Sequence, residues 1–151
     1  MVAAGGTAGH VVPAMAVAEE LRASGALVTW LGTRERIEAE LVPAAGYEID
    51  FIKARGIDRR NPVKAAVAAG EAMRSVGAAK RALRARRADV VMGGGGFVAG
   101  PAGLAAVLGR IPLVLTEADS HLGLANRLLA GRARACPQKE QTEPWKKRPE
   151  S

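Results

Sequence analysis

The 151-residue sequence is poor in cysteine, in aromatic residues and in long apolar runs. Its one cysteine, Cys136, excludes an internal disulfide and a cysteine-ligated metal cluster. No segment approaches the ~18 consecutive apolar residues of a membrane-spanning helix, and no signal-peptide pattern opens the chain. Aromatic residues make up 3% of a sequence that is 48% hydrophobic, which suits Ala-rich and Val-rich helices packed on a parallel sheet. These features indicate one globular, cytoplasmic domain.

Basic residues outnumber acidic ones by 22 to 15, and the isoelectric point is near 10.3. This balance favours anionic partners, namely phosphorylated small molecules, lipid headgroups or nucleic acid. The excess is concentrated in residues 64–87, where Glu71 is the one acidic residue, and we interpret this segment first as a solvated helix face. Nucleic acid is the least favoured partner, because aromatic stacking platforms and known reader motifs are lacking.

Strand-like and helix-like segments alternate about five times along the chain. We predict strands near residues 1–4, 27–31, 47–52, 88–93 and 111–117. Helices are predicted from Pro13 to about Ala23, over 35–42, from 62 to about 87, from Pro101 to 108 and over 124–135. This order predicts an α/β, Rossmann-like parallel sheet with helices on both faces. Ligands of such sheets bind beyond the carboxyl ends of the strands.

The first glycine-rich turn, "GGTAGH", follows a strand and precedes a helix. Its N–H groups can point at an anion, and Thr7 adds a hydroxyl donor. The glycine spacing matches neither the dinucleotide pattern nor a Walker loop, and a generic tight turn is the alternative interpretation. His10 is either a general base or hydrogen-bond donor at this turn, or a structural histidine.

The second glycine-rich stretch, "GGGGFVAGP", permits close approach by a bulky ligand or by the first glycine turn. Phe97 lines a pocket or belongs to the core. The segment "TEADSHLG" brings Glu117, Asp119 and His121 to the same edge of the sheet, where a carboxylate caps a helix, positions a hydroxyl or acts as a base. We therefore expect all three segments to lie side by side.

Four motifs in order resemble the amino-terminal domain of the MurG-like glycosyltransferases, GT-B enzymes of family 28. They cover about residues 2–135 and read "GGTAGHVVPAMAVAEEL", "WLGTRERIEAELVPAAGYEIDFI", "DVVMGGGGFVAGPAGLAA" and "IPLVLTEADSHLGLANRLLA". The resemblance implies transfer of N-acetylglucosamine from its UDP derivative to a lipid-diphosphate-linked muramoyl pentapeptide in peptidoglycan synthesis. It also implies inversion at the sugar, no metal or other cofactor, and a peripheral position on an anionic membrane surface at the cytoplasmic face.

The resemblance also implies roles for individual residues. His10 and Glu117 are the candidates for the base that deprotonates the acceptor hydroxyl, and the sequence does not separate them. The residues implied in substrate binding belong to the three segments at the sheet edge and to the helix after them: Thr7, Ala8, Gly9, Gly94, Gly95, Gly96, Phe97, Asp119 and Asn126.

The chain departs from the family pattern at several positions. Ala8 stands where the family has Gly, Phe97 where it has Tyr, and residues 116–119 read Thr-Glu-Ala-Asp in place of His-Glu-Gln-Asn. Asp119 thus replaces an Asn that contacts the donor sugar. The segment matching the family's membrane-facing patch has Met73 and Val76 but no aromatic residue.

The resemblance and the composition together predict the domain organisation. Residues 1–135 are expected to form the acceptor-binding amino-terminal half of a GT-B fold, and the proline-rich, charged residues 136–151 a disordered tail. The carboxy-terminal domain that holds the UDP-sugar is expected to be missing, so the chain alone should be a poor catalyst: a fragment, a truncated gene product, or one half of an enzyme that a separate chain completes. The alternatives are a non-catalytic module that binds a lipid diphosphate or a partner, and a relative with another glycolipid acceptor.

Overall fold

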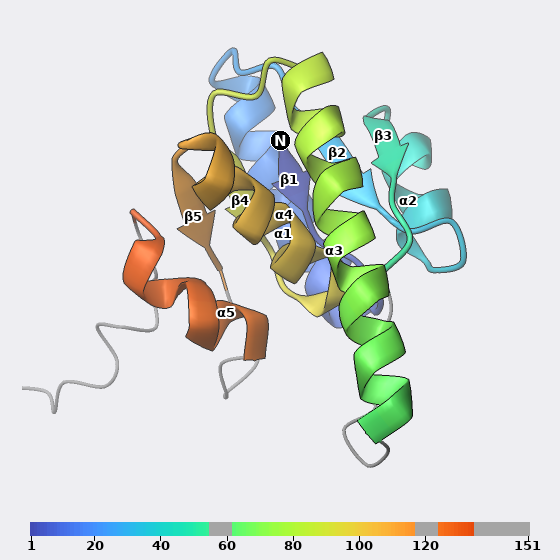
Figure 1. Cartoon of the computed structure of the whole chain (residues 1–151). Helices are drawn as coiled ribbons and strands as arrows, with labels where there is room; N and C mark the ends of the chain where they lie inside the picture. Colours follow the sequence, from blue (N-terminus) through green and yellow to red (C-terminus); the bar gives the residue numbers. More distant parts are fainter. Residues whose placement is uncertain (55–61, 117–123, 135–151) are drawn as a thin grey trace, which may run out of the picture.

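A computed structural model describes residues 1–54, 62–116 and 124–134 of the chain. In these residues five parallel strands form one sheet, in the order β3-β2-β1-β4-β5. The strands are β1 (Val2–Ala3), β2 (Thr29–Gly32), β3 (Glu48–Phe51), β4 (Val91–Gly93) and β5 (Leu113–Leu115). The helices are α1 (Ala8–Ala23), α2 (Glu38–Ala44), α3 (Pro62–Ala85), α4 (Gly96–Gly109) and α5 (Leu124–Leu129), followed by the 3-10 turn η1 (Ala130–Arg132). Figure 1 shows their arrangement.

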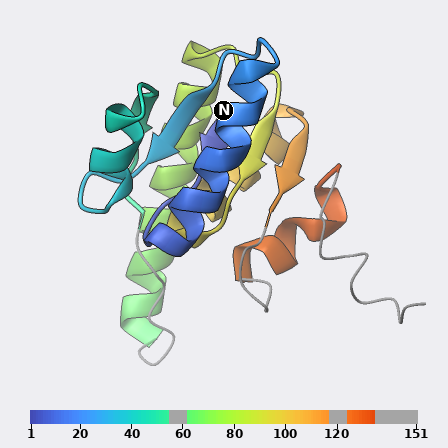
Figure 2. The same cartoon turned by 180° about the vertical axis from the view of Figure 1, so that it is seen from behind.

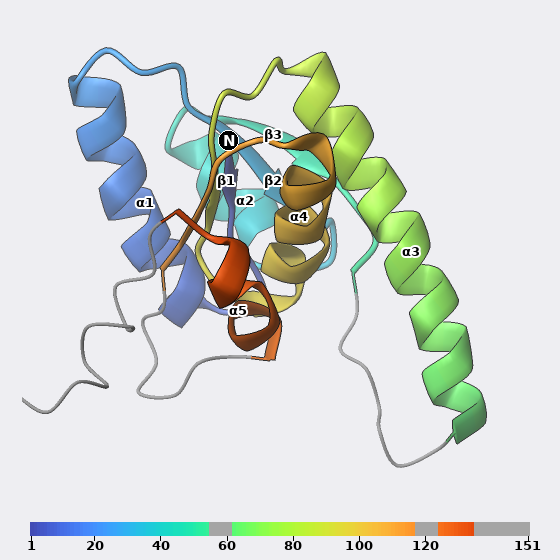
Figure 3. The same ribbon diagram turned by 60° about the vertical axis from the view of Figure 1, so that its left-hand side comes forward.

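Helices cover both faces of the sheet, as Figures 2 and 3 show. Successive strand residues point to opposite faces, so Val2 packs with α1 and α2, whereas Ala3 packs with α3, α4 and α5. Trp30 and Leu31 divide in the same way on β2. The predicted α/β, Rossmann-like fold with two covered faces is therefore confirmed.

The strand order reverses between the two central strands. From β1 the chain builds outward to β2 and β3, and it then returns to place β4 on the other side of β1, followed by β5. Such a reversal opens a crevice beyond the carboxyl ends of the two central strands, which is where ligands bind in sheets of this kind. The two glycine-rich turns leave β1 and β4 and therefore flank this position.

Two helices begin earlier than the sequence predicts. The structure starts α1 at Ala8 and α4 at Gly96, so Pro13 and Pro101 lie inside the helices and do not open them. The prediction was wrong because a proline is also tolerated one turn further in. There it removes a single hydrogen bond, to the carbonyl of Gly9 or of Phe97, close to a helix end where bonding is already incomplete. Much of each glycine-rich "turn" is thus the first turn of a helix.

Helix α3 presents its charge to solvent and its apolar residues to the sheet. Arg74, Arg81 and Arg84 are exposed, as predicted for a solvated basic face. Val76 is buried together with Ala79 and Leu83, which are spaced for one helix face, so its assignment to a membrane-facing patch is wrong. No helix within the described ranges combines the length and apolar character needed to span a membrane.

An ion-pair cluster fixes the end of α3 to the edge strand β3. The Arg86 guanidinium donates to both carboxylate oxygens of Asp50, at 2.8 and 3.1 Å, and also pairs with Glu48. These hydrogen bonds raise the pKa of Arg86 above its ordinary value, and those to Asp50 contribute more than the one to Glu48. Because this cluster lies at the surface, its contribution to stability is small.

A buried carboxylate joins β1, β2 and α2. Glu38, the first residue of α2, is fully buried and accepts three hydrogen bonds. The Gly6 N–H donates at 3.0 Å, and the Thr33 N–H and hydroxyl donate at 2.9 and 2.7 Å. There is room for the carboxylate because Gly5 and Gly32 have no side chains: a β-carbon on Gly5 would overlap it, and one on Gly32 would lie 2.7 Å from its Cγ. Glu38 therefore couples the turn after β1 to the turn after β2.

We predict that Glu38 makes the stability of the domain sensitive to acid. Burial alone would raise the pKa of this carboxyl, but the hydrogen bonds from Gly6 and Thr33 outweigh it and hold the pKa below its ordinary value of 4.5. The stabilisation is therefore complete above pH 4.5 and is lost as the pH falls through the lower pKa of the folded state.

Urea unfolding of the wild type and of Glu38→Gln between pH 3 and pH 7 tests this. At neutral pH the variant should lose about 1–3 kcal/mol of unfolding free energy, because a Gln amide cannot accept from the Gly6 N–H while also accepting from Thr33. The difference between the two proteins should shrink toward acid pH. Parallel pH profiles would show that the ionised carboxylate contributes nothing.

Candidate functional site

The two glycine-rich segments are in direct backbone contact at the carboxyl edge of the sheet. A β-carbon on Gly96 would overlap the carbonyl oxygen of Gly5, and one on Gly94 would lie 2.8 Å from the β-carbon of Ala4. Gly95 and Gly96 also have φ values of +91° and +75°, which L side chains rarely adopt. Of the two explanations for the glycine run, close approach by the first glycine turn is therefore confirmed.

Two buried side chains, those of Trp30 and Glu38, hold the first glycine-rich turn by hydrogen bonds to its backbone. The Trp30 indole N–H donates to the Ala4 carbonyl at 2.9 Å, which fixes the last peptide before the turn. The Gly6 N–H then donates to Glu38, so it points into the protein and not toward a ligand. The donors of this segment that a ligand could reach are consequently those of Thr7, Ala8 and Gly9, whose residues are exposed.

Thr7 and His10 form a pair at the start of α1. Thr7 is the N-cap residue but makes no capping hydrogen bond with its side chain. Its hydroxyl instead lies 3.0 Å from Nδ1 of His10. The imidazole packs on Gly95, because a β-carbon there would overlap its Cδ2 and lie 3.0 Å from Nε2. The predicted base candidate thus lies where the two segments meet.

The amino ends of α1 and α4 meet at the same edge of the sheet, from its two opposite faces (Figure 3). The first N–H groups of a helix have no intrahelical partner, and the helix dipole adds positive potential there. Two such ends in contact form a surface suited to an anion with several oxygens, such as a diphosphate. Phe97 borders this surface: the residue is 46% exposed, and its Cδ2 lies 3.9 Å from a β-carbon placed on Gly6, so the core interpretation of Phe97 is wrong.

Four of the other predicted residues are buried or lie outside the described ranges. Gly94 is buried and its N–H donates to the Ala3 carbonyl at 2.9 Å, so it continues the strand pairing. Asn126 is 2% exposed, and its amide donates to the carbonyl of Thr116 at 3.2 Å, which fastens α5 to the end of β5. Glu117 and Asp119 fall in residues 117–123, outside the described ranges.

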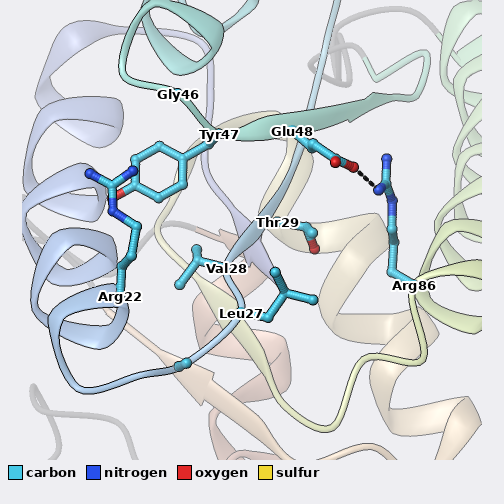
Figure 4. A pocket seen from close by; sticks show the side chains of 9 residues that line it. Arg22, Leu27, Val28, Thr29, Gly46, Tyr47, Glu48 and Arg86 are labelled. Atoms are coloured by element: carbon cyan, nitrogen blue, oxygen red, sulfur yellow. Dashed lines mark hydrogen bonds and ion pairs between the residues drawn. The ribbon is translucent and has the colours of Figure 1, made fainter.

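A shallow pocket of about 290 Å³ lies at the opposite edge of the sheet, at the amino ends of β2 and β3 (Figure 4). Its charged side chains already engage neighbours: Arg22 stacks on the Tyr47 ring at 4.5 Å, and Arg86 pairs with Glu48. None of the residues predicted to bind substrate lines this pocket. The candidate site is therefore the surface formed by the two glycine-rich segments.

Glu38 is the residue that sequence reasoning missed. It stands in "RERIEAE", where Glu35 and Glu40 are exposed and look the same in sequence. One signal in the sequence, "LGT" at the end of a strand, indicates this burial. The glycine leaves room for a carboxylate from the short acidic helix that follows, and the threonine supplies hydrogen-bond donors to it.

Comparison with known proteins identifies this arrangement. The model of the glycosyltransferase family 28 N-terminal domain matches residues 1–137. A protein of Aeromonas hydrophila subsp. hydrophila is 50% identical over 130 residues, and one of Shewanella pealeana is 48% identical over the same length. Both are named "UDP-N-acetylglucosamine--N-acetylmuramyl-(pentapeptide) pyrophosphoryl-undecaprenol N-acetylglucosamine transferase". The alignments cover 86% of this chain and 36% of each relative, so the chain spans about a third of their length.

A solved structure agrees with the sequence relatives. The crystal structure of Acinetobacter baumannii MurG superposes with a TM-score of 0.79 at 36% sequence identity, covering 90% of this chain and 40% of that one. The fold is therefore that of part of a GT-B enzyme. Since the family model extends over most of the sequence, the chain belongs to glycosyltransferase family 28, whose amino-terminal domain it carries.

Proposed function

We propose that this chain is the acceptor-binding domain of a glycosyltransferase. The enzyme transfers N-acetylglucosamine from UDP-N-acetylglucosamine to the muramoyl pentapeptide of a polyprenyl-diphosphate-linked acceptor. The names of the relatives support this choice of substrates. Residues 1–135 form the domain, and a second domain or chain supplies most of the UDP-sugar site.

The observation that carries the proposal is the contact between the amino ends of α1 and α4. A diphosphate bound there accepts hydrogen bonds from the N–H groups of Ala8 and Gly9 and from the Thr7 hydroxyl, whereas Gly96 and Phe97 supply the opposite helix end. Donors fixed in place before the ligand arrives stabilise its charge without reorganisation. Glu117 and Asp119, which the sequence assigns to the same edge, complete the proposed site as a candidate base and as a contact to the donor sugar.

His10 can have either of two chemical roles in this site, and the role depends on the tautomer of the imidazole, that is, on the direction of its hydrogen bond with Thr7. If Nδ1–H donates to the Thr7 hydroxyl, Nε2 can accept the proton of the attacking acceptor hydroxyl. If Thr7 donates to Nδ1, then Nε2 carries the proton and can donate to a phosphate oxygen. We propose the first arrangement, with Glu117 as the alternative base.

The surface of α3 suits a peripheral position on the cytoplasmic face of the membrane. Each Lys or Arg close to an anionic bilayer contributes about 1 kcal/mol of attraction, and Arg74, Arg81 and Arg84 are all exposed. The exposed Met73 adds an apolar contact among them. This face is distinct from the edge that carries the proposed diphosphate site.

The first prediction from the proposed function concerns activity. The purified chain should not transfer radiolabelled N-acetylglucosamine to a lipid-diphosphate acceptor alone, but it should do so when mixed with the carboxy-terminal half of a relative, because transfer requires both halves to surround the sugar. Absence of transfer in the mixture, with folding of both parts confirmed by circular dichroism, would leave a binding module and reject the catalytic proposal.

The second prediction separates the roles of His10. In the reconstituted enzyme His10→Ala should lower kcat by roughly 10²–10⁴-fold if the imidazole is the base. Thr7→Val should lower it about tenfold, because the imidazole loses the hydrogen bond that orients it, and should also raise KM, because the diphosphate loses the hydroxyl donor. Steady-state kinetics over a range of acceptor concentrations measures both. A His10→Ala effect confined to KM would instead assign the imidazole to binding.

The third prediction tests the packing of His10 on the second segment. Gly95→Ala should displace the imidazole and lower kcat at least tenfold, because the new β-carbon overlaps Cδ2 and φ is +91°. Gly131→Ala is the matched control, since a β-carbon there meets nothing within 4 Å. Equal activity of the two variants would show that the position of His10 is immaterial to the reaction.

A further inference from the structure

We propose that Glu38 is a positioning residue of the diphosphate site. By accepting the Gly6 N–H, it holds the turn after β1 so that the N–H groups of Ala8 and Gly9 face the ligand. This inference rests on the proposed function, because it concerns the same site. It adds a residue that does not touch substrate and that lies beneath the glycine turn.

The two oxygens of the carboxylate have separate partners. Oε1 accepts both donors of Thr33, at 2.9 and 2.7 Å, and Oε2 accepts the Gly6 N–H at 3.0 Å. Oε1 therefore fixes the carboxylate to the end of β2, and Oε2 fixes the glycine turn to the carboxylate. A neutral side chain of the same shape can serve only one of these ends, since a Gln amide presents one oxygen and one NH₂ group.

The direction of the Gly6 N–H decides what the rest of the turn can do. Gly6 has a φ of +99°, and the next residue, Thr7, is extended at φ −134° and ψ 159° before α1 begins at Ala8. With Gly6 directed inward, the following N–H groups emerge at the amino end of α1. Release of Gly6 would free a peptide that can rotate, because glycine has no side chain to limit it.

A charge argument makes the proposal testable by sign. The Glu38 carboxylate lies beneath a site proposed for an anion, so its charge by itself repels the ligand. If Glu38 acted only through charge, its neutralisation would tighten anion binding. If it acts by positioning, neutralisation weakens binding, because the donors lose their fixed direction.

The experiment uses the ¹⁵N-labelled 151-residue chain, with inorganic pyrophosphate as the probe. Glu38→Gln is compared with Thr33→Val, a matched control of nearly the same shape that removes one donor to Oε1 and leaves the Gly6 hydrogen bond. Three quantities are measured: the urea midpoint, the hydrogen-exchange rate of the Gly6 N–H, and the pyrophosphate Kd from the amide shifts of Ala8 and Gly9.

Both variants should have a lowered urea midpoint, which reports the structural contribution alone. Only Glu38→Gln should speed exchange of the Gly6 N–H, by about tenfold relative to Thr33→Val, and weaken pyrophosphate binding by a similar factor. Pyrophosphate binding by Glu38→Gln as tight as that of Thr33→Val, or tighter, would overturn the positioning role.

Two further results keep the test decisive. If Glu38→Gln does not fold, the wild type still tests the anchor, because its Gly6 N–H should exchange more slowly than those of Ala8 and Gly9; equal rates would overturn the proposal. If the wild type itself does not bind pyrophosphate, the diphosphate site of the proposed function fails, and slow Gly6 exchange would then support only the anchoring of the turn.

Discussion

The contact between the backbone of Gly5 and that of Gly96 is the constraint on which the rest of the site depends. Because β1 and β4 are central neighbours while α1 and α4 cover opposite faces, the segments leaving these strands must cross at one edge of the sheet. They can cross so closely only without side chains. The crossing joins two helix amino ends into one donor surface and lets the imidazole of His10 pack on Gly95. The glycines therefore act first on each other, and through that contact on a ligand.

Much of this architecture could be predicted from the sequence, because alternation of strand and helix dictates a parallel sheet and places the strand-end segments together. The starts of α1 and α4 could not be predicted. A proline near the start of a helix is compatible both with the first helical position and with the sixth, where Pro13 and Pro101 lie. Val76 was misplaced for a related reason. It closely follows the exposed residues Met73 and Arg74 in sequence, and only the rotation of α3 against the sheet shows which side is covered.

Within the site, the residues predictable from sequence are those that the local chain presents directly, such as Thr7 and His10 beside a glycine turn. The burial of Glu38 was only partly signalled by the sequence, because it depends on space left by the nearby Gly32 and also by Gly5, which is distant in sequence. Asn126 is a related case. The resemblance implies a role for it in substrate binding, and only the structure shows that its amide also fastens α5 to the carbonyl of Thr116. Residues that hold a site from beneath are recognised only from tertiary contacts.

The distribution of charge separates the two proposed tasks of this domain. The basic excess lies on α3, on the opposite face of the sheet from α1, where it suits attraction to an anionic surface. The edge that carries the donor surface has instead a buried carboxylate beneath it, so binding of an anion there relies on oriented N–H groups and not on net charge. Oriented donors act strongly only when water is excluded. An edge site formed by one layer of turns is open to water on its outer side, so the proposed transfer depends on a second protein body that faces these turns and encloses the sugar.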